Sequence, residues 1–217
     1  MNADIKVKNY KKYFLLAAPL VIMLTVYIVL TPLVQRFGTA RGLLYGYLFY
    51  WGFWGIIFPL WTVGLKGFAK MFSATAENIG KAGWLLLGMP VIIYPAVSLP
   101  EIWPEITLTL VLLSIPLALI NGTLEELLWR GTYITAFPEK LFPGYIFPAV
   151  AFGIWHVAPY AAMPDFGAEG AVIATIGGTL FGLCWGWAAW KSGSIRLAVI
   201  SHILANFLAL GALSFMG

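Results

Sequence analysis

Long apolar runs dominate this chain and restrict what it can fold into. Seven of them follow one another with short polar segments between: Tyr13–Val34, Gly42–Gly64, Ala82–Leu99, Ile106–Phe137, Phe142–Tyr160, Ala171–Trp190 and Ile195–Met216. A helix of about 20 apolar residues crosses the hydrocarbon core of a bilayer. Only 10% of the residues are charged, too few to cover the surface of a soluble protein. The sequence therefore predicts an all-α polytopic membrane protein with about seven transmembrane helices.

The basic residues predict how these helices are oriented. With the N-terminus in the cytoplasm, the cytoplasmic segments hold ten of the 13 basic residues: Lys6, Lys8, Lys11, Lys12, Lys66, Lys70, Lys81, Lys140, Lys191 and Arg196. Arg36 and Arg41 fall on the other side, and Arg130 lies within the fourth run. This excess follows the positive-inside rule. We therefore expect a cytoplasmic N-terminus. The location expected for this multi-pass protein is the cytoplasmic membrane of a prokaryote.

The remaining composition limits the possible domains and partners. No linker or internal repeat divides the chain, so we expect one membrane domain over residues 1–217, in which residues 82–217 hold all the motifs and residues 1–81 hold none. The single cysteine, Cys184, excludes an intrachain disulfide and a cysteine-rich metal site. The net charge of +4 comes from the helix ends, so it predicts the lipid bilayer and no nucleic acid as a partner.

Ionisable side chains inside the apolar runs are costly in a membrane and usually functional. They occur in three runs: Glu125, Glu126 and Arg130 in the fourth, His156 in the fifth, and His202, followed by Asn206, in the seventh. With a helical rise of 1.5 Å, Glu125, His156 and His202 lie roughly 18, 20 and 12 Å from the cytoplasmic ends of their helices. These similar depths predict that the three helices bring their polar groups into one cavity.

The spacing within each helix predicts which side chains can face that cavity. Glu126 and Arg130 are four residues apart, which suits an ion pair, and the pair is either structural or part of a site. Glu125 is rotated by about 100° from Glu126 and is therefore free to face the cavity. His202 and Asn206 share one helix face. Phe152 precedes His156 by one turn.

These residue types are those of peptide-bond hydrolysis. A glutamate can act as the general base that activates water, while histidine and asparagine can bind the water or stabilise the oxyanion. Glu125, His156 and His202 also match the ligand set of a catalytic zinc ion, although the HExxH motif is missing. A membrane histidine can instead be a simple interhelical hydrogen-bonding group.

Three motifs carry a family resemblance. Residues 125–130 read EELLWR and fit EExxxR, residues 152–156 read FGIWH and fit FxxxH, and residues 202–206 read HILAN and fit HxxxN. Together and in this order, they resemble the CAAX-protease and bacteriocin-processing family of intramembrane endopeptidases. The resemblance extends from about Asn121 to Phe207.

The resemblance implies a role for each of these residues. Glu125 would activate the water, His156 would help to orient it, and His202 with Asn206 would form the oxyanion site. Glu126 is counted with these catalytic residues, although it and Arg130 would be supporting or structural, and Phe152 would be supporting. We expect no cofactor, with zinc as the alternative, and a membrane-anchored peptide or protein as the substrate. The alternatives are a non-catalytic immunity or scaffold protein on the same fold and a proton-coupled transporter. We also expect the cavity to open toward the cytoplasm.

Overall fold

The computed structural model describes residues 7–72, 79–163 and 167–211, and within these ranges the chain is helical and forms no strand. The helices are α1 (Asn9–Phe37), α2 (Thr39–Phe49), η1 (Tyr50–Ile57), α3 (Phe58–Lys70), α4 (Gly80–Ile102), η3 (Trp103–Glu105), α5 (Leu108–Glu126), η4 (Leu127–Gly131), α6 (Thr132–Ala136), η5 (Phe142–Ile146), α7 (Phe147–Trp155), α8 (Val157–Ala162), α9 (Gly167–Ser192) and α10 (Arg196–Leu208). Lys6 and the predicted end of the last run at Met216 lie outside the described residues.

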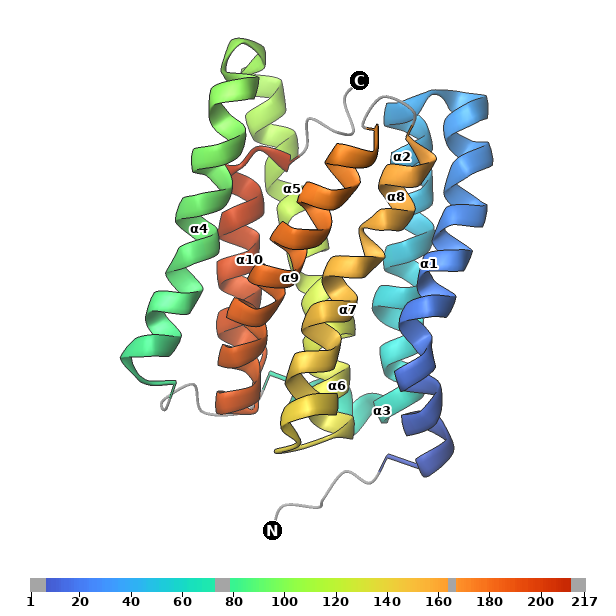
Figure 1. The fold of residues 1–217 in the computed structure, drawn as a ribbon, viewed down its shortest axis with the longest axis vertical. Coiled ribbons are helices and arrows are strands. Elements are labelled where there is room, and N and C mark those ends of the chain that lie inside the picture. Colours follow the sequence, from blue (N-terminus) through green and yellow to red (C-terminus); the bar gives the residue numbers. More distant parts are fainter. Residues whose placement is uncertain (1–6, 73–78, 164–166, 212–217) are drawn as a thin grey trace.

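The elements combine into seven crossings of a bundle, as the apolar runs predict. Six helical stretches are long and apolar enough to span a membrane: Asn9–Phe37, Thr39–Lys70, Gly80–Glu105, Leu108–Ala136, Phe142–Ala162 and Gly167–Ser192. The seventh, α10, is apolar but has only 13 residues. In Figure 1 the crossings run up and down the long axis, so that the described chain begins at one end of the bundle and finishes at the other. The all-α, seven-helix prediction is thereby confirmed.

Two glycines allow the close helix contacts that assemble the central region. A Cβ atom built on Gly122 of α5 would lie 2.9 Å from the backbone nitrogen of Ile203, so glycine lets α10 pack directly against α5. A Cβ atom on Gly178 of α9 would lie 2.9 Å from Nδ1 of His156, so glycine also leaves room for this imidazole. Small residues commonly permit such approaches in membrane proteins. These contacts place Glu125, His156 and His202 on the inside of the bundle.

Two π-helical segments, η1 and η4, interrupt the α-helices next to this region. In η4, the Leu127 carbonyl accepts from the backbone N–H of Thr132, five residues on, and the Thr132 hydroxyl also donates to it at 2.8 Å. η1 is eight residues long and has four buried residues: Tyr50, Trp51, Trp54 and Gly55. Single π-turns within helices are often found at functional sites. Here η1 faces α5, the helix that carries the adjacent glutamates.

Candidate active site

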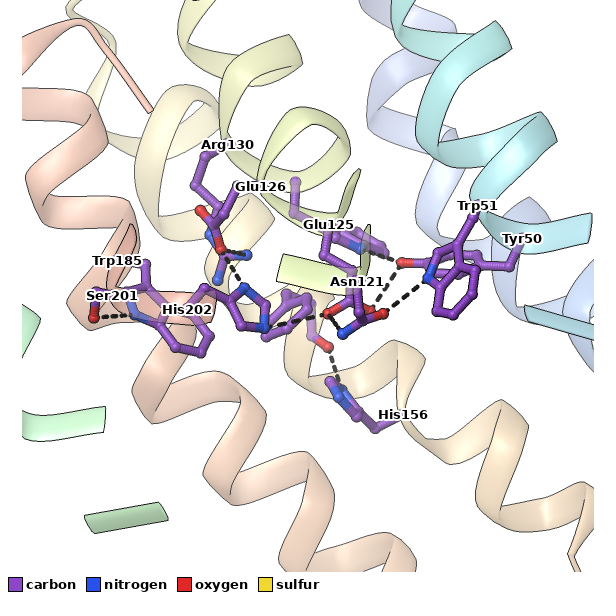
Figure 2. Close-up of polar contacts among 12 residues, drawn as sticks. Tyr50, Trp51, Asn121, Glu125, Glu126, Arg130, His156, Trp185, Ser201 and His202 are labelled. Atoms are coloured by element: carbon purple, nitrogen blue, oxygen red, sulfur yellow. Dashed lines mark hydrogen bonds and ion pairs between the residues drawn. The ribbon is translucent and has the colours of Figure 1, made fainter. Parts of the chain in front are cut away.

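The predicted polar residues gather around one cavity of about 690 Å³ at the centre of the bundle. Glu125 on α5, His156 at the junction of α7 and α8, and His202 and Asn206 on α10 all line it, together with Phe152. Figure 2 shows the side chains of Glu125, His156 and His202 pointing toward one another from their three helices. The structure therefore joins the three sequence motifs in one place, as their similar depths predict.

Glu125 is buried and has a partner on each side-chain oxygen. Its Oε1 atom accepts a hydrogen bond from the Tyr50 hydroxyl at 3.4 Å, and its Oε2 atom accepts one from the Asn121 amide at 3.1 Å. Oε2 also lies 3.6 Å from Nε2 of His202. A carboxylate has about four lone-pair sites, so these contacts leave capacity for a water or substrate group from the cavity.

Glu126 points away from the cavity and toward His202 and Arg130. Its Oε1 atom lies 2.9 Å from Nδ1 of His202 and 2.9 Å from Nη1 of Arg130 (Figure 2). Glu126 is fully buried, and it is not among the residues that line the cavity. The i,i+4 pair predicted from the sequence is therefore present, and its carboxylate also orients a histidine from another helix.

Aromatic rings hold the other faces of this cluster. The guanidinium carbon of Arg130 lies 4.2 Å from the ring centre of Phe152 and 5.4 Å from that of Trp185. Its nitrogens make no well-aligned hydrogen bond with the described residues, so the ion pair and the cation–π contacts hold the charge. Phe152, expected beside His156, thus also contacts the arginine.

The partners of His202 determine where its protons lie. Glu126 is paired with Arg130, so this carboxylate accepts, and Nδ1 of His202 must donate to it. In the neutral imidazole, Nε2 then carries the lone pair that faces Glu125. The 3.6 Å between Nε2 and Oε2 of Glu125 separates two proton acceptors unless one of them is protonated. One proton shared across this pair would make the contact favourable.

His156 and Asn206 both line the cavity, but they differ in their hydrogen-bond partners. Nδ1 of His156 lies 2.7 Å from the carbonyl oxygen of Phe152, and a carbonyl only accepts, so this nitrogen carries the proton and leaves Nε2 as an acceptor. Asn206 is partly exposed to the cavity, and the described residues provide no hydrogen-bond partner for its side chain. A polar group without a protein partner in a cavity is available to a ligand.

Sequence reasoning missed five contributors to this site: Tyr50, Trp51, Asn121, Trp185 and Ser201. Trp185 stacks on His202 with ring centres 3.9 Å apart, and its indole nitrogen donates to the Ser201 hydroxyl at 2.9 Å. Asn121 carried a usable signal, because it is a polar residue in an apolar run one turn before Glu125. Tyr50 and Trp51, the two residues from η1, gave no such signal beyond lying among other aromatic residues.

The zinc alternative requires Glu125, His156 and His202 to converge on one metal ion. Within the described parts of the chain, no group of three or more His, Cys, Asp or Glu side chains is placed to hold a metal ion. Nδ1 of His156 and Nδ1 of His202 each bond a protein oxygen, which leaves Nε2 of both rings as the possible ligand atom, as in most metal-binding histidines. Zinc held by Glu125, His156 and His202 therefore stays the alternative to a metal-free site.

The cavity extends along the bundle in both directions from Glu125. Its lining includes Leu43, Val97, Met163 and Gly211 toward one end, and Leu86 and Tyr145 toward the end with the N-terminal lysines. The expected opening toward the cytoplasm stays a prediction.

Residues 107–208 match the family model described as Type II CAAX prenyl endopeptidase Rce1-like. The matched segment begins at Thr107, whose hydroxyl caps the first turn of α5, and ends at the last residue of α10. It contains all three motifs and leaves out η1. No curated protein and no solved structure matches the chain significantly.

Proposed function

We propose that Glu125 activates a water molecule for hydrolysis of a peptide bond in a membrane-associated protein or peptide, since residues 107–208 belong to the family of Rce1-like type II CAAX prenyl endopeptidases. This match confirms the resemblance of the three motifs. The observation that carries this proposal is the position of Glu125. It is a buried carboxylate that lines a central cavity and faces two histidines from other helices. A general base must lie within reach of the proton that it removes, and this cavity has room for water beside Glu125.

The residues around Glu125 would orient the water and stabilise the oxyanion during hydrolysis. Glu125 removes a proton from the water, and the resulting hydroxide attacks the peptide carbonyl. His156, whose Nε2 atom is an acceptor, orients this water from the other side. The negative charge that develops on the carbonyl oxygen needs donors, which the Asn206 amide and Nε2 of a protonated His202 supply. Glu125 then passes its proton to the leaving amine, so that the peptide bond breaks and the carboxylate is restored.

Glu126 and Arg130 support the charge on His202. Donation from Nε2 to an oxyanion requires both nitrogens of His202 to be protonated. The Glu126 carboxylate lies 2.9 Å from Nδ1 of His202 and 2.9 Å from Nη1 of Arg130, so its negative charge compensates a positive charge on the imidazole as well as that of the guanidinium. The Glu126–Arg130 ion pair would therefore contribute to catalysis through His202.

The lining of the cavity supports a substrate held in the membrane. It is mostly apolar, with Leu86, Ile93 and Leu180 among the lining residues, and polar groups are concentrated near Glu125. Such a surface suits an apolar segment or a lipid-modified tail, the kind of substrate that the family description names. We propose the cytoplasmic membrane of a prokaryote as the location and a membrane-anchored peptide as the substrate.

Cleavage by the purified protein tests this function. Wild type would be assayed in detergent with quenched peptides that carry either an apolar segment or a prenylated tail, beside Glu125→Gln and the matched control Glu105→Gln, an exposed acid far from the cavity. We expect Glu125→Gln to lose activity by roughly 10²–10⁴-fold, because general base catalysis contributes that much. Glu105→Gln should keep the wild-type rate.

Two outcomes would change the proposal. Full activity of a folded Glu125→Gln protein would refute the role of the glutamate. Loss of activity with a strong chelator, restored by zinc, would instead favour the metal-dependent mechanism with Glu125, His156 and His202 as ligands.

A further inference from the structure

Two side chains hold the Glu125 carboxylate, and each of them is itself oriented by a tryptophan. We propose that Tyr50 and Asn121 are positioning residues that fix the plane of this carboxylate, with Trp129 and Trp51 fixing the direction in which each of them donates. The proposal rests on the function proposed for Glu125. It assigns part of the site to η1, which lies outside the segment that matches the family.

The first arm runs from Trp129 through Tyr50 to Glu125. An indole nitrogen can only donate, so Nε1 of Trp129, 2.8 Å from the Tyr50 hydroxyl, makes this oxygen the acceptor. The single proton of the hydroxyl is then free to be donated to Oε1 of Glu125 at 3.4 Å. The Tyr50 ring stacks on Trp155 with centres 4.4 Å apart, which leaves it little freedom to turn away. The direction of this donor is therefore set by two tryptophans.

The second arm runs from Trp51 through Asn121 to Glu125. Nε1 of Trp51 lies 2.9 Å from Oδ1 of Asn121, and since the indole only donates, the atom facing it must be the amide oxygen. The amide nitrogen is thereby turned toward Oε2 of Glu125, 3.1 Å away. Figure 2 shows Tyr50 reaching Glu125 and Trp51 reaching Asn121 from the same segment.

The two arms together determine how Glu125 can act. Each carboxylate oxygen receives one donor from the protein, so rotation of the carboxyl group would break both hydrogen bonds at once. One lone pair on each oxygen remains for the cavity side. A base held in this way keeps its productive orientation before the water arrives, which is how supporting residues contribute to a catalytic site.

Conservative substitutions with matched controls test the two arms. Tyr50→Phe and Trp51→Phe each remove one polar atom from the network. Tyr133→Phe removes a buried hydroxyl that donates to the Leu15 carbonyl, and Trp54→Phe removes an indole nitrogen that donates to Thr25. The controls are equally buried and, for the tryptophan, lie on the same helix.

In full-length purified enzyme, we expect Tyr50→Phe and Trp51→Phe to lower kcat by roughly 10–100-fold, the usual effect of removing a residue that orients a catalytic group, with KM unchanged. The control variants should keep the wild-type kcat. Because Trp129 acts through Tyr50, the double variant Tyr50→Phe/Trp129→Phe should be no slower than Tyr50→Phe alone. A kcat for Tyr50→Phe and Trp51→Phe equal to that of their controls would overturn the inference.

A second measurement needs no substrate. A membrane-soluble carbodiimide modifies protonated carboxyl groups, and Glu125 is open to the cavity whereas Glu126 is not. Loss of the Tyr50 donor in Tyr50→Phe, or of the Trp51 contact that orients the Asn121 donor in Trp51→Phe, should speed the modification of Glu125 by roughly ten-fold, because hydrogen bonds donated to a carboxylate favour its charged form. Mass spectrometry of the modified peptide measures this rate. Equal rates in these variants and their controls would contradict the inference.

The two proposals fail in different ways. If Glu125→Gln retains full activity, the proposed function is wrong, and the positioning role fails with it. If Glu125→Gln is inactive while Tyr50→Phe and Trp51→Phe behave like their controls in both measurements, only the positioning role is wrong.

Discussion

At the residue scale, the Glu126 carboxylate contacts two basic side chains, Arg130 on η4 and His202 on α10. The side chains of all three are at most 3% exposed, so each charge depends on the others for its compensation. Taking a charge out of water is costly, and a buried pair is favourable only while both partners are present. The cluster therefore stabilises the contact between α5, η4 and α10 and also orients the histidine.

Glu126→Gln should separate these two effects. It leaves the Arg130 charge buried without an anion, and we expect it to lower the free energy of unfolding by about 3–5 kcal/mol. The double variant Glu126→Gln/Arg130→Met removes both charges and should regain much of this stability. It should not regain activity, since His202 still lacks its carboxylate. Unfolding in detergent, followed by circular dichroism, gives the stability. Equal stability of Glu126→Gln and wild type would contradict the expected charge imbalance.

At the element scale, packing between helices brings the motifs together. Glu125 and His202 are 77 residues apart in sequence, and their contact depends on the close approach of α5 and α10 at Gly122. A side chain there would meet the backbone of Ile203, which cannot move aside as a flexible side chain can.

Gly122→Val should therefore push α10 away from α5 and abolish peptidase activity by separating His202 from Glu125. Gly88→Ala on α4 is the control, since a Cβ atom there meets nothing within 4 Å. Cleavage rates and melting temperatures of the two variants give the comparison, and Gly88→Ala should match wild type in both. An active, stable Gly122→Val protein would show that this approach is not needed.

The sequence predicted the helices and the meeting of three motifs because both depend on simple periodic signals. Apolar length gives a crossing, and depth along a helix brings Glu125, His156 and His202 to one level. The contributions of Tyr50 and Trp51 had no such signal. Clustered Tyr and Trp residues are typical of the membrane interface, yet Tyr50, Trp51 and Trp54 are at most 3% exposed. Their rotation is set by η1, and no pattern in the sequence marks a helix that widens to a π-turn.

At the scale of the whole molecule, the odd number of crossings places the two ends of the described chain on opposite faces of the membrane (Figure 1). The end with Lys8 also carries Lys70, Lys140 and Arg196, and the other end carries Arg36, Arg41 and Glu105. The positive-inside rule then places Lys8 in the cytoplasm.

Cysteine labelling in intact cells tests this orientation. Cys184 is buried, and Cys184→Ala provides a background without reactive thiols. In that background, we expect Glu105→Cys to react with a membrane-impermeant maleimide from outside and Lys8→Cys to react only after the cells are opened. The reverse pattern would show that the orientation is inverted.

The shortness of α10 has a consequence for how the site is hydrated. At 13 residues, this helix is roughly 20 Å long, against a hydrocarbon core of about 30 Å, so it ends within the depth of the membrane. The Ser98 hydroxyl donates to the Ala209 carbonyl there, and Gly211 lines the cavity. Non-helical backbone at this depth is stable only where it is buried in protein or contacts water. Ala209 and Leu210 are 3% and 7% exposed, so protein covers most of this helix end, and the partly exposed Gly211 is the point at which we expect water in the cavity to reach it.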